Sequence, residues 1–149
     1  MTMKLKQFQA DLTAGKYDEK LCKLYGSSDA VLAAQRARYL QAAENFSCLY
    51  PEWEEIAVFS APGRTEIGGN HTDPEEKGKS AALIRGVVSR FQEMGVAVGG
   101  FDAYTTSNVL SGSGLSSSAA FEVLIGTIID QHYHAGAAGA VEIAKIGQY

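Results

Sequence analysis

Glycines and serines gather in one short stretch just ahead of a helical pattern. The stretch consists of Gly112, Ser113, Gly114, Leu115, Ser116, Ser117 and Ser118. Apolar residues then recur between positions 121 and 129 at the spacing of one helix face. Glycine lets a backbone approach a phosphate closely, and the free N–H groups and dipole of a first helical turn attract anions. The stretch therefore predicts a phosphate-binding loop, with a serine-rich N-cap as the alternative.

Two common phosphate loops do not fit this stretch. A P-loop needs Gly-Lys-Ser/Thr, and no lysine occurs between Ala97 and Ala144. A dinucleotide fingerprint needs a third glycine where this chain has Ser117. What remains is a nucleotide loop built from backbone amides and hydroxyls.

The stretch resembles the ATP-binding motif of the GHMP small-molecule kinases. One difference is Leu110, which stands where that motif usually has a proline. The resemblance implies ATP as the bound nucleotide and Mg²⁺ as its companion. It also implies that Ser118 is the loop serine that holds the magnesium ion.

A second polar segment follows a predicted strand over residues 54–59. A Pro62-Gly63 turn ends the strand, and two further glycines lie at 68 and 69. The polar residues of the segment include Arg64, Asn70, His71, Thr72 and Asp73. They offer many hydrogen-bonding groups for a polyhydroxylated ligand, although such a segment taken alone is more often a solvated loop.

Residues 60–73 resemble the galactokinase signature, which opens with Pro-Gly-Arg and closes with Glu-His-Thr-Asp. The resemblance implies that Arg64 steadies charge during phosphoryl transfer, with an ordinary salt bridge as the alternative role. It implies sugar contacts for His71, Thr72 and Asp73. Asn70 stands where most galactokinases have glutamate, so the sugar contact there differs and strict galactose specificity does not follow.

The resemblance also implies an incomplete domain. In the family, a run of strands follows the His-Thr-Asp segment, whereas here Asp73 passes directly into Pro74 and a polar stretch. The family's magnesium-binding glutamate, catalytic aspartate and second domain come later than Tyr149. We therefore expect residues 1–149 to be a partial GHMP kinase N-terminal domain with an internal deletion, either truncated or part of a longer protein. We expect this chain alone to be inactive.

Local patterns predict an α+β fold, with a mixed sheet and helices packed on one face. The predicted helices cover residues 5–14, 19–25, 28–43 and 80–94, the segment after the serine stretch, and a last segment from about 141. Besides residues 54–59, a strand is predicted over 100–109.

Composition narrows the function classes. The net charge of −4 over 149 residues, without a basic cluster, argues against nucleic-acid binding. The sequence has no apolar run of membrane-spanning length, and its first residues are too polar for a signal peptide. Cys22 and Cys48 are expected to be reduced. These features together predict a cytoplasmic location. The sequence predicts a galactokinase-like sugar kinase with a sugar and ATP as ligands; the alternative is a non-catalytic galactose and ATP sensor. It does not indicate an oligomeric state.

Overall fold

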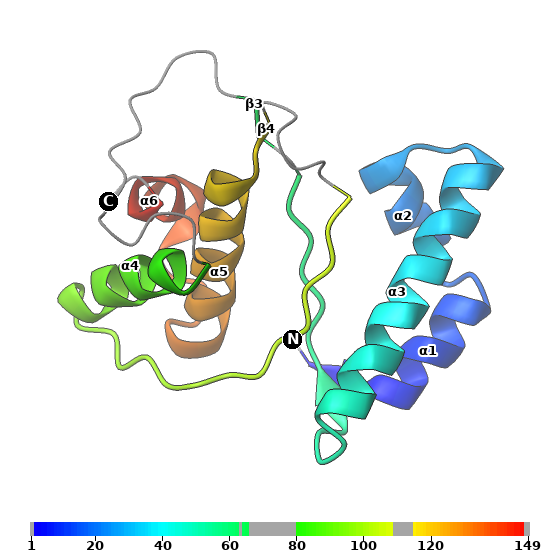
Figure 1. Ribbon diagram of the computed structural model, residues 1–149, viewed down its shortest axis with the longest axis horizontal. Helices are drawn as coiled ribbons and strands as arrows, with labels where there is room; N and C mark the ends of the chain where they lie inside the picture. The colour runs from blue at the N-terminus through cyan, green and yellow to red at the C-terminus, as the bar shows by residue number, and fades with distance from the viewer. Residues whose placement is uncertain (1, 63, 66–79, 109–114, 148–149) are drawn as a thin grey trace. The chain divides into compact units, whose positions relative to one another are not determined.

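The computed structural model describes residues 2–62, 64–65, 80–108 and 115–147 (Figure 1). For residues 64, 65 and 115–117 the description is limited to the backbone. The chain divides into two compact units. The first unit comprises residues 1–58 and 101–106, and the second comprises residues 59–100 and 107–149.

Three helices build the first unit, at the places where the sequence predicts them. They are α1 (Leu5–Thr13), α2 (Asp18–Tyr25) and α3 (Asp29–Leu49). The third helix runs beyond its predicted end at residue 43. It begins directly after Ser28, which caps it: the Ser28 hydroxyl accepts a hydrogen bond from the Val31 N–H at 3.3 Å.

The core of the first unit lies between these helices. Its buried members are Leu5, Phe8, Leu12, Leu21 and Ala43. Three of them come from one face of α1, where they recur at helical spacing. The core is extended at one end by a short antiparallel sheet of β1 (Met3–Lys4) and β2 (Glu55–Ile56), in which Met3 lies opposite Ile56.

The described part of the second unit also contains three helices. They are α4 (Ser80–Glu93), α5 (Ser117–Tyr133) and α6 (Gly139–Ile146). As predicted, α4 ends before Gly95, which takes the left-handed backbone conformation with φ +84°. The Val96 N–H then donates to the Phe91 carbonyl at 3.0 Å, which satisfies one of the helix's last carbonyl groups.

A glycine lets the helices of the second unit approach one another closely. A β-carbon on Gly126 of α5 would lie 3.1 Å from Ile143 of α6 and 3.8 Å from Val87 of α4. Phe91 and Ile129 are fully buried in the same unit. Because Gly126 lacks a side chain, the backbone of α5 can approach both neighbouring helices.

The prediction of an α+β class is confirmed in outline. The described residues are mostly helical and form two small antiparallel sheets, β1–β2 and β3 (Arg64–Thr65) with β4 (Leu115–Ser116). The described residues contain no larger mixed sheet with helices on one face. The strand predicted over 54–59 is limited to Glu55–Ile56.

The prediction of a strand over 100–109 is wrong for its described part. Residues 100–108 form no strand, and Val109 lies outside the described residues. The residue types favour a strand, but a strand also needs a neighbour to complete its hydrogen bonds.

Two further observations concern the cysteines and the apolar character of the helices. The Cys22 and Cys48 thiols are free, as predicted. Within the described ranges, no helix combines the length and the apolar character needed to cross a membrane.

Candidate functional site

A backbone ladder joins the two polar motifs. Strands β3 and β4 pair antiparallel, with Arg64 opposite Ser116 and Thr65 opposite Leu115. Residues far apart in the sequence therefore lie side by side, and both belong to the second unit (Figure 1). Thr65 had no predicted role. The sequence signal for a role of Thr65 in the site is its position directly after Arg64.

The ladder leads straight into a helix. Strand β4 ends at Ser116 and α5 begins at Ser117, so the Arg64 backbone pairs with the residue just before the helix. The first N–H groups of a helix have no partner within the helix, and the helix dipole places partial positive charge there. An anion at this end of α5 would therefore lie beside the Arg64 strand.

Ser118 is the one predicted loop residue whose side chain the structure describes. It is half-buried in the first turn of α5, and among the described residues its hydroxyl makes no hydrogen bond. The neighbouring Ala119 is buried, so the turn is anchored in the core of the second unit. The Ser118 hydroxyl thus remains available to a ligand.

Several predicted site residues are not covered in full. Only the backbone is described for Arg64, Leu115, Ser116 and Ser117. The predicted residues outside the described ranges are Asn70, His71, Thr72, Asp73, Gly112, Ser113 and Gly114. Their roles stay predictions.

The far end of α5 is held by a buried carboxylate that sequence reasoning missed. Asp130 is only 1% exposed, and its Oδ1 accepts a hydrogen bond from the Ala138 N–H at 3.0 Å. The Asp130 carbonyl also accepts from His134 and Gly136 at 3.0 and 2.9 Å. This one residue fixes the turn between α5 and α6. A carboxylate directly after two isoleucines, Ile128 and Ile129, was the available signal.

The metal prediction rests on a single side chain. In the part of the chain that the structure describes, no three His, Cys, Asp or Glu side chains come together as a metal site. Mg²⁺ commonly takes one or two protein ligands and completes its shell with water and phosphate oxygens. The Ser118 hydroxyl fits that mode of binding, in which the nucleotide itself supplies oxygen ligands.

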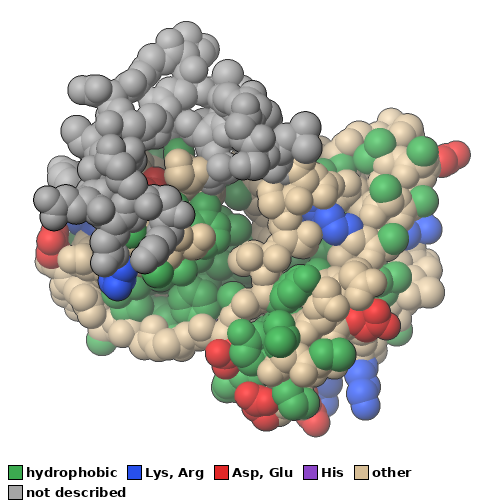
Figure 2. Space-filling view, in the orientation of Figure 1, with side chains coloured by type: hydrophobic (Ala, Val, Ile, Leu, Met, Phe, Trp, Pro, Cys, Tyr) green, Lys and Arg blue, Asp and Glu red, His purple; other side chains and the backbone are tan. Residues whose placement is uncertain are grey.

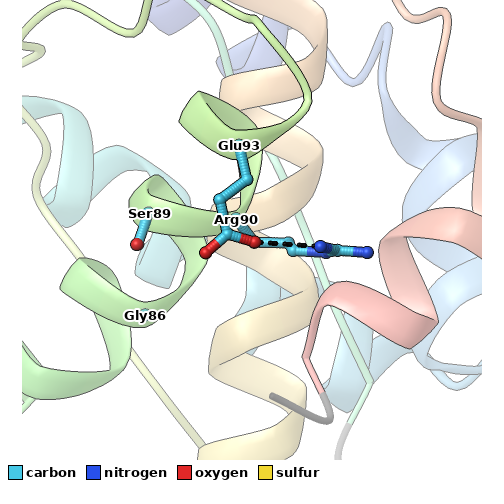
Figure 3. A pocket seen from close by; sticks show the side chains of 4 residues that line it. All are labelled: Gly86, Ser89, Arg90 and Glu93. Carbon is cyan, nitrogen blue, oxygen red and sulfur yellow. Dashed lines mark hydrogen bonds and ion pairs between the residues drawn. The ribbon is translucent and has the colours of Figure 1, made fainter.

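An open pocket of about 240 Å³ lies along α4, away from the predicted site residues in sequence. Its lining residues are Gly86, Ser89, Arg90 and Glu93 (Figure 3). Arg90 donates a hydrogen bond to Glu93 at 2.9 Å within the same helix. The volume is below the range of about 300–1,000 Å³ that is typical of ligand pockets, and no predicted residue lines it. We do not assign the pocket to the site.

Comparison with known protein families finds one match for each of the two polar motifs. Residues 44–77 match the galactokinase galactose-binding signature, and residues 82–149 match the GHMP kinases N terminal domain. In these two regions the chain is similar to galactokinase-type GHMP kinases. No solved structure matches it.

For this galactokinase-like chain, each family match contains one motif. The galactose-binding signature includes Arg64 and residues 70–73, and the kinase domain match includes residues 112–118. GHMP kinases use ATP, so the two matches together imply a sugar and a nucleotide as ligands. The ladder between Arg64 and Ser116 brings the two matched regions into contact.

Proposed function

We propose that this chain is the ATP- and sugar-binding part of a galactokinase-like kinase that phosphorylates the anomeric hydroxyl of galactose or a close relative. In that reaction the γ-phosphoryl group of ATP passes to the sugar hydroxyl, which loses its proton, and the products are the sugar 1-phosphate and ADP. The pairing of Arg64 with Ser116 is the observation that carries this proposal, because it joins the sugar motif to the helix that would hold the phosphates.

We assign each motif a separate role. The backbone N–H groups of residues 112–118 and the dipole of α5 would bind the phosphates, and the Ser118 hydroxyl would ligate Mg²⁺. When bound, Mg²⁺ neutralises charge on the phosphate oxygens. The Arg64 guanidinium would stabilise the charge that develops on the transferred group. Asn70, His71, Thr72 and Asp73 would bind the sugar hydroxyls.

The proposed domain is a GHMP kinase N-terminal domain whose sheet, in the complete fold, is mixed and covered by helices on one face. Phosphoryl transfer requires the nucleophile to be oriented as well as the phosphates to be bound. The motifs of residues 1–149 account for binding and charge stabilisation, and they offer no aspartate assigned to orient the hydroxyl. We therefore expect this chain to bind both ligands without turnover.

A charge at the start of α5 tests the phosphate site. In Ser117→Asp, a carboxylate in the first turn favours the helix by about 0.3–1 kcal/mol through its dipole, yet repels phosphate. We expect ATP binding, measured by calorimetry with Mg²⁺ present, to weaken at least about tenfold, which corresponds to about 1.4 kcal/mol. Galactose binding should remain unchanged.

The matched control is Ala140→Asp, which places the same charge in the first turn of α6 at an exposed position. It should leave ATP binding unchanged. Equal ATP affinity in Ser117→Asp and the unmodified chain would rule out this helix as the phosphate site. If the unmodified chain binds neither ATP nor galactose, the proposed function is wrong. Galactose-dependent release of ADP would contradict the expected lack of turnover.

A further inference from the structure

The single tryptophan of the chain is exposed. Trp53 is 51% exposed, whereas tryptophan side chains in folded proteins are mostly buried. Two other large side chains of the same unit, Leu49 and Tyr104, are also exposed. Figure 2 shows hydrophobic side chains gathered around the C-terminal end of α3, where Leu49 is the last residue. Large apolar side chains that are exposed together are typical of interaction surfaces.

Two hydrogen bonds between side chains bring these residues together. The Trp53 indole N–H donates to Asp102 Oδ2 at 2.9 Å, and the Asn45 amide donates to the Tyr104 hydroxyl at 2.8 Å. Asp102 and Tyr104 are two residues apart, and Asn45 lies one helical turn before Leu49 on the same face of α3. We call Leu49, Trp53 and Tyr104 the exposed aromatic surface. Because hydrogen bonds already hold both rings, a partner that binds there loses little affinity to side-chain ordering.

Carboxylates accompany the exposed aromatic surface. Glu52 and Glu54 are both exposed and flank Trp53 in the sequence, and Asp102 is hydrogen-bonded to the Trp53 ring. In the described part of the chain, none of these three carboxylates forms an ion pair. Asp102 also keeps its Oδ1 without a hydrogen bond there. The surface therefore offers an aromatic ring beside negative charge that no cation of the described chain neutralises.

This combination favours a partner that is both cationic and apolar. Arginine fits the two features at once, because its planar guanidinium stacks on an indole ring and donates hydrogen bonds to a carboxylate. Apolar side chains beside that arginine would cover Leu49. A second copy of this chain suits the surface less well, because the chain carries a net charge of −4 and like charges oppose association.

We propose that the exposed aromatic surface binds a basic and apolar segment of another protein, with an arginine of that segment stacked on Trp53 and paired with Asp102. Glu52 and Glu54 attract the segment over a longer range, and salt screens that attraction. Leu49 and Tyr104 contact its apolar side chains. This inference goes beyond the proposed kinase function and does not depend on it.

A short blocked peptide of alternating arginine and leucine is the probe for this surface. It is added to the full chain, and the fluorescence of Trp53 reports binding. We expect a saturable change whose midpoint moves to higher peptide concentration as salt is raised. Peptides with glutamate in place of arginine, or with serine in place of leucine, should bind at least about tenfold more weakly.

Two variants with the same loss of charge separate this surface from general attraction to an acidic protein. Asp102→Asn keeps an oxygen acceptor for the Trp53 indole N–H and should weaken peptide binding at least about tenfold. Asp29→Asn is the matched control at an exposed position in the first turn of α3, and it should change the affinity less than about twofold. Trp53→Ala, followed by calorimetry, should lose binding as Asp102→Asn does.

Several outcomes overturn the proposal. They are no binding of the arginine–leucine peptide, equal affinity in Asp102→Asn and the unmodified chain, and equal affinity for the serine-substituted peptide, which would indicate attraction by charge alone. Sedimentation of the chain without peptide tests the other occupant. Association that grows with concentration and is abolished by Trp53→Ala would show that a second copy covers the surface, and would overturn the proposal too.

Discussion

Each of the two units has three helices among its described residues, but their polar groups are used differently. In the first unit the ion pairs are exposed, as in Lys23 with Glu19 at 2.7 Å, or half-buried, as in Arg36 with Asp18. In the second unit a carboxylate, that of Asp130, is buried and bonded to the backbone of the next helix turn. Surface pairs contribute little to stability, whereas an unsatisfied buried group is costly.

The buried carboxylate of the second unit is explained by the helix that this unit has to position. Helix α5 of the second unit carries the candidate phosphate site at its first turn, and Asp130 fixes its other end. The first unit closes through contacts of α3 with α1 and α2 and through the short β1–β2 sheet. We expect substitutions to separate the two units clearly, and three predictions test that separation.

The largest effect is expected from the two cores. Phe91→Ala, at a fully buried site in the second unit, should lower the free energy of unfolding by about 3–5 kcal/mol. Leu12→Ala, at an equally buried site in the first unit, should cost about 2–5 kcal/mol. Urea unfolding followed by circular dichroism measures both losses.

Amide exchange then tests whether the cores are separate. Phe91→Ala should accelerate exchange mainly in α4–α6, and Leu12→Ala mainly in α1–α3. If both variants accelerate the same helices, the division into two units does not describe the stability of the chain.

A smaller loss is expected at the buried carboxylate. Asp130→Ala leaves the Ala138 N–H without its acceptor and should cost about 1–3 kcal/mol in the free energy of unfolding. Asp130→Asn keeps an oxygen acceptor of the same shape and is the matched control, with a smaller loss in the same urea titration. Equal losses in the two variants would show that the charge of Asp130, rather than this hydrogen bond, holds the turn.

The smallest effect is expected at the surface of the first unit. The hydrogen bond from Lys16, followed by that from Gln7, lowers the pKa of Asp11 below its ordinary value of 3.8. The folded state therefore favours the ionised carboxylate. The stabilisation is present above pH 3.8 and is lost as the pH falls through the folded-state pKa.

Removing the ammonium group should reverse most of that shift. In Lys16→Met, the pKa of Asp11 should rise toward 3.8, as measured by titration of its carboxyl carbon in NMR. Lys23→Met is the control, because Lys23 pairs with Glu19 instead. An unchanged Asp11 pKa in Lys16→Met would show that the pair in the structure does not persist in solution.

Local signals in the sequence predicted the helices well. Ser28 caps α3 and Gly95 follows the end of α4, because side-chain capping and left-handed glycine conformations depend on neighbouring residues alone. The extended segments were predicted less well. Residues 55–56 form a strand and residues 100–108 do not, although both stretches have suitable residue types.

The candidate site likewise combines local features that the sequence determines with contacts that only the tertiary structure decides. The sequence by itself determined that a glycine–serine stretch precedes a helix and that a polar Arg64 segment follows a strand, since both are patterns of adjacent residues. Only the tertiary structure decided that Arg64 pairs with Ser116, that Asp130 is buried, and that residues 101–106 remain unpaired. Strand pairing and burial depend on which distant segments meet, and a local pattern holds no information about its eventual partner.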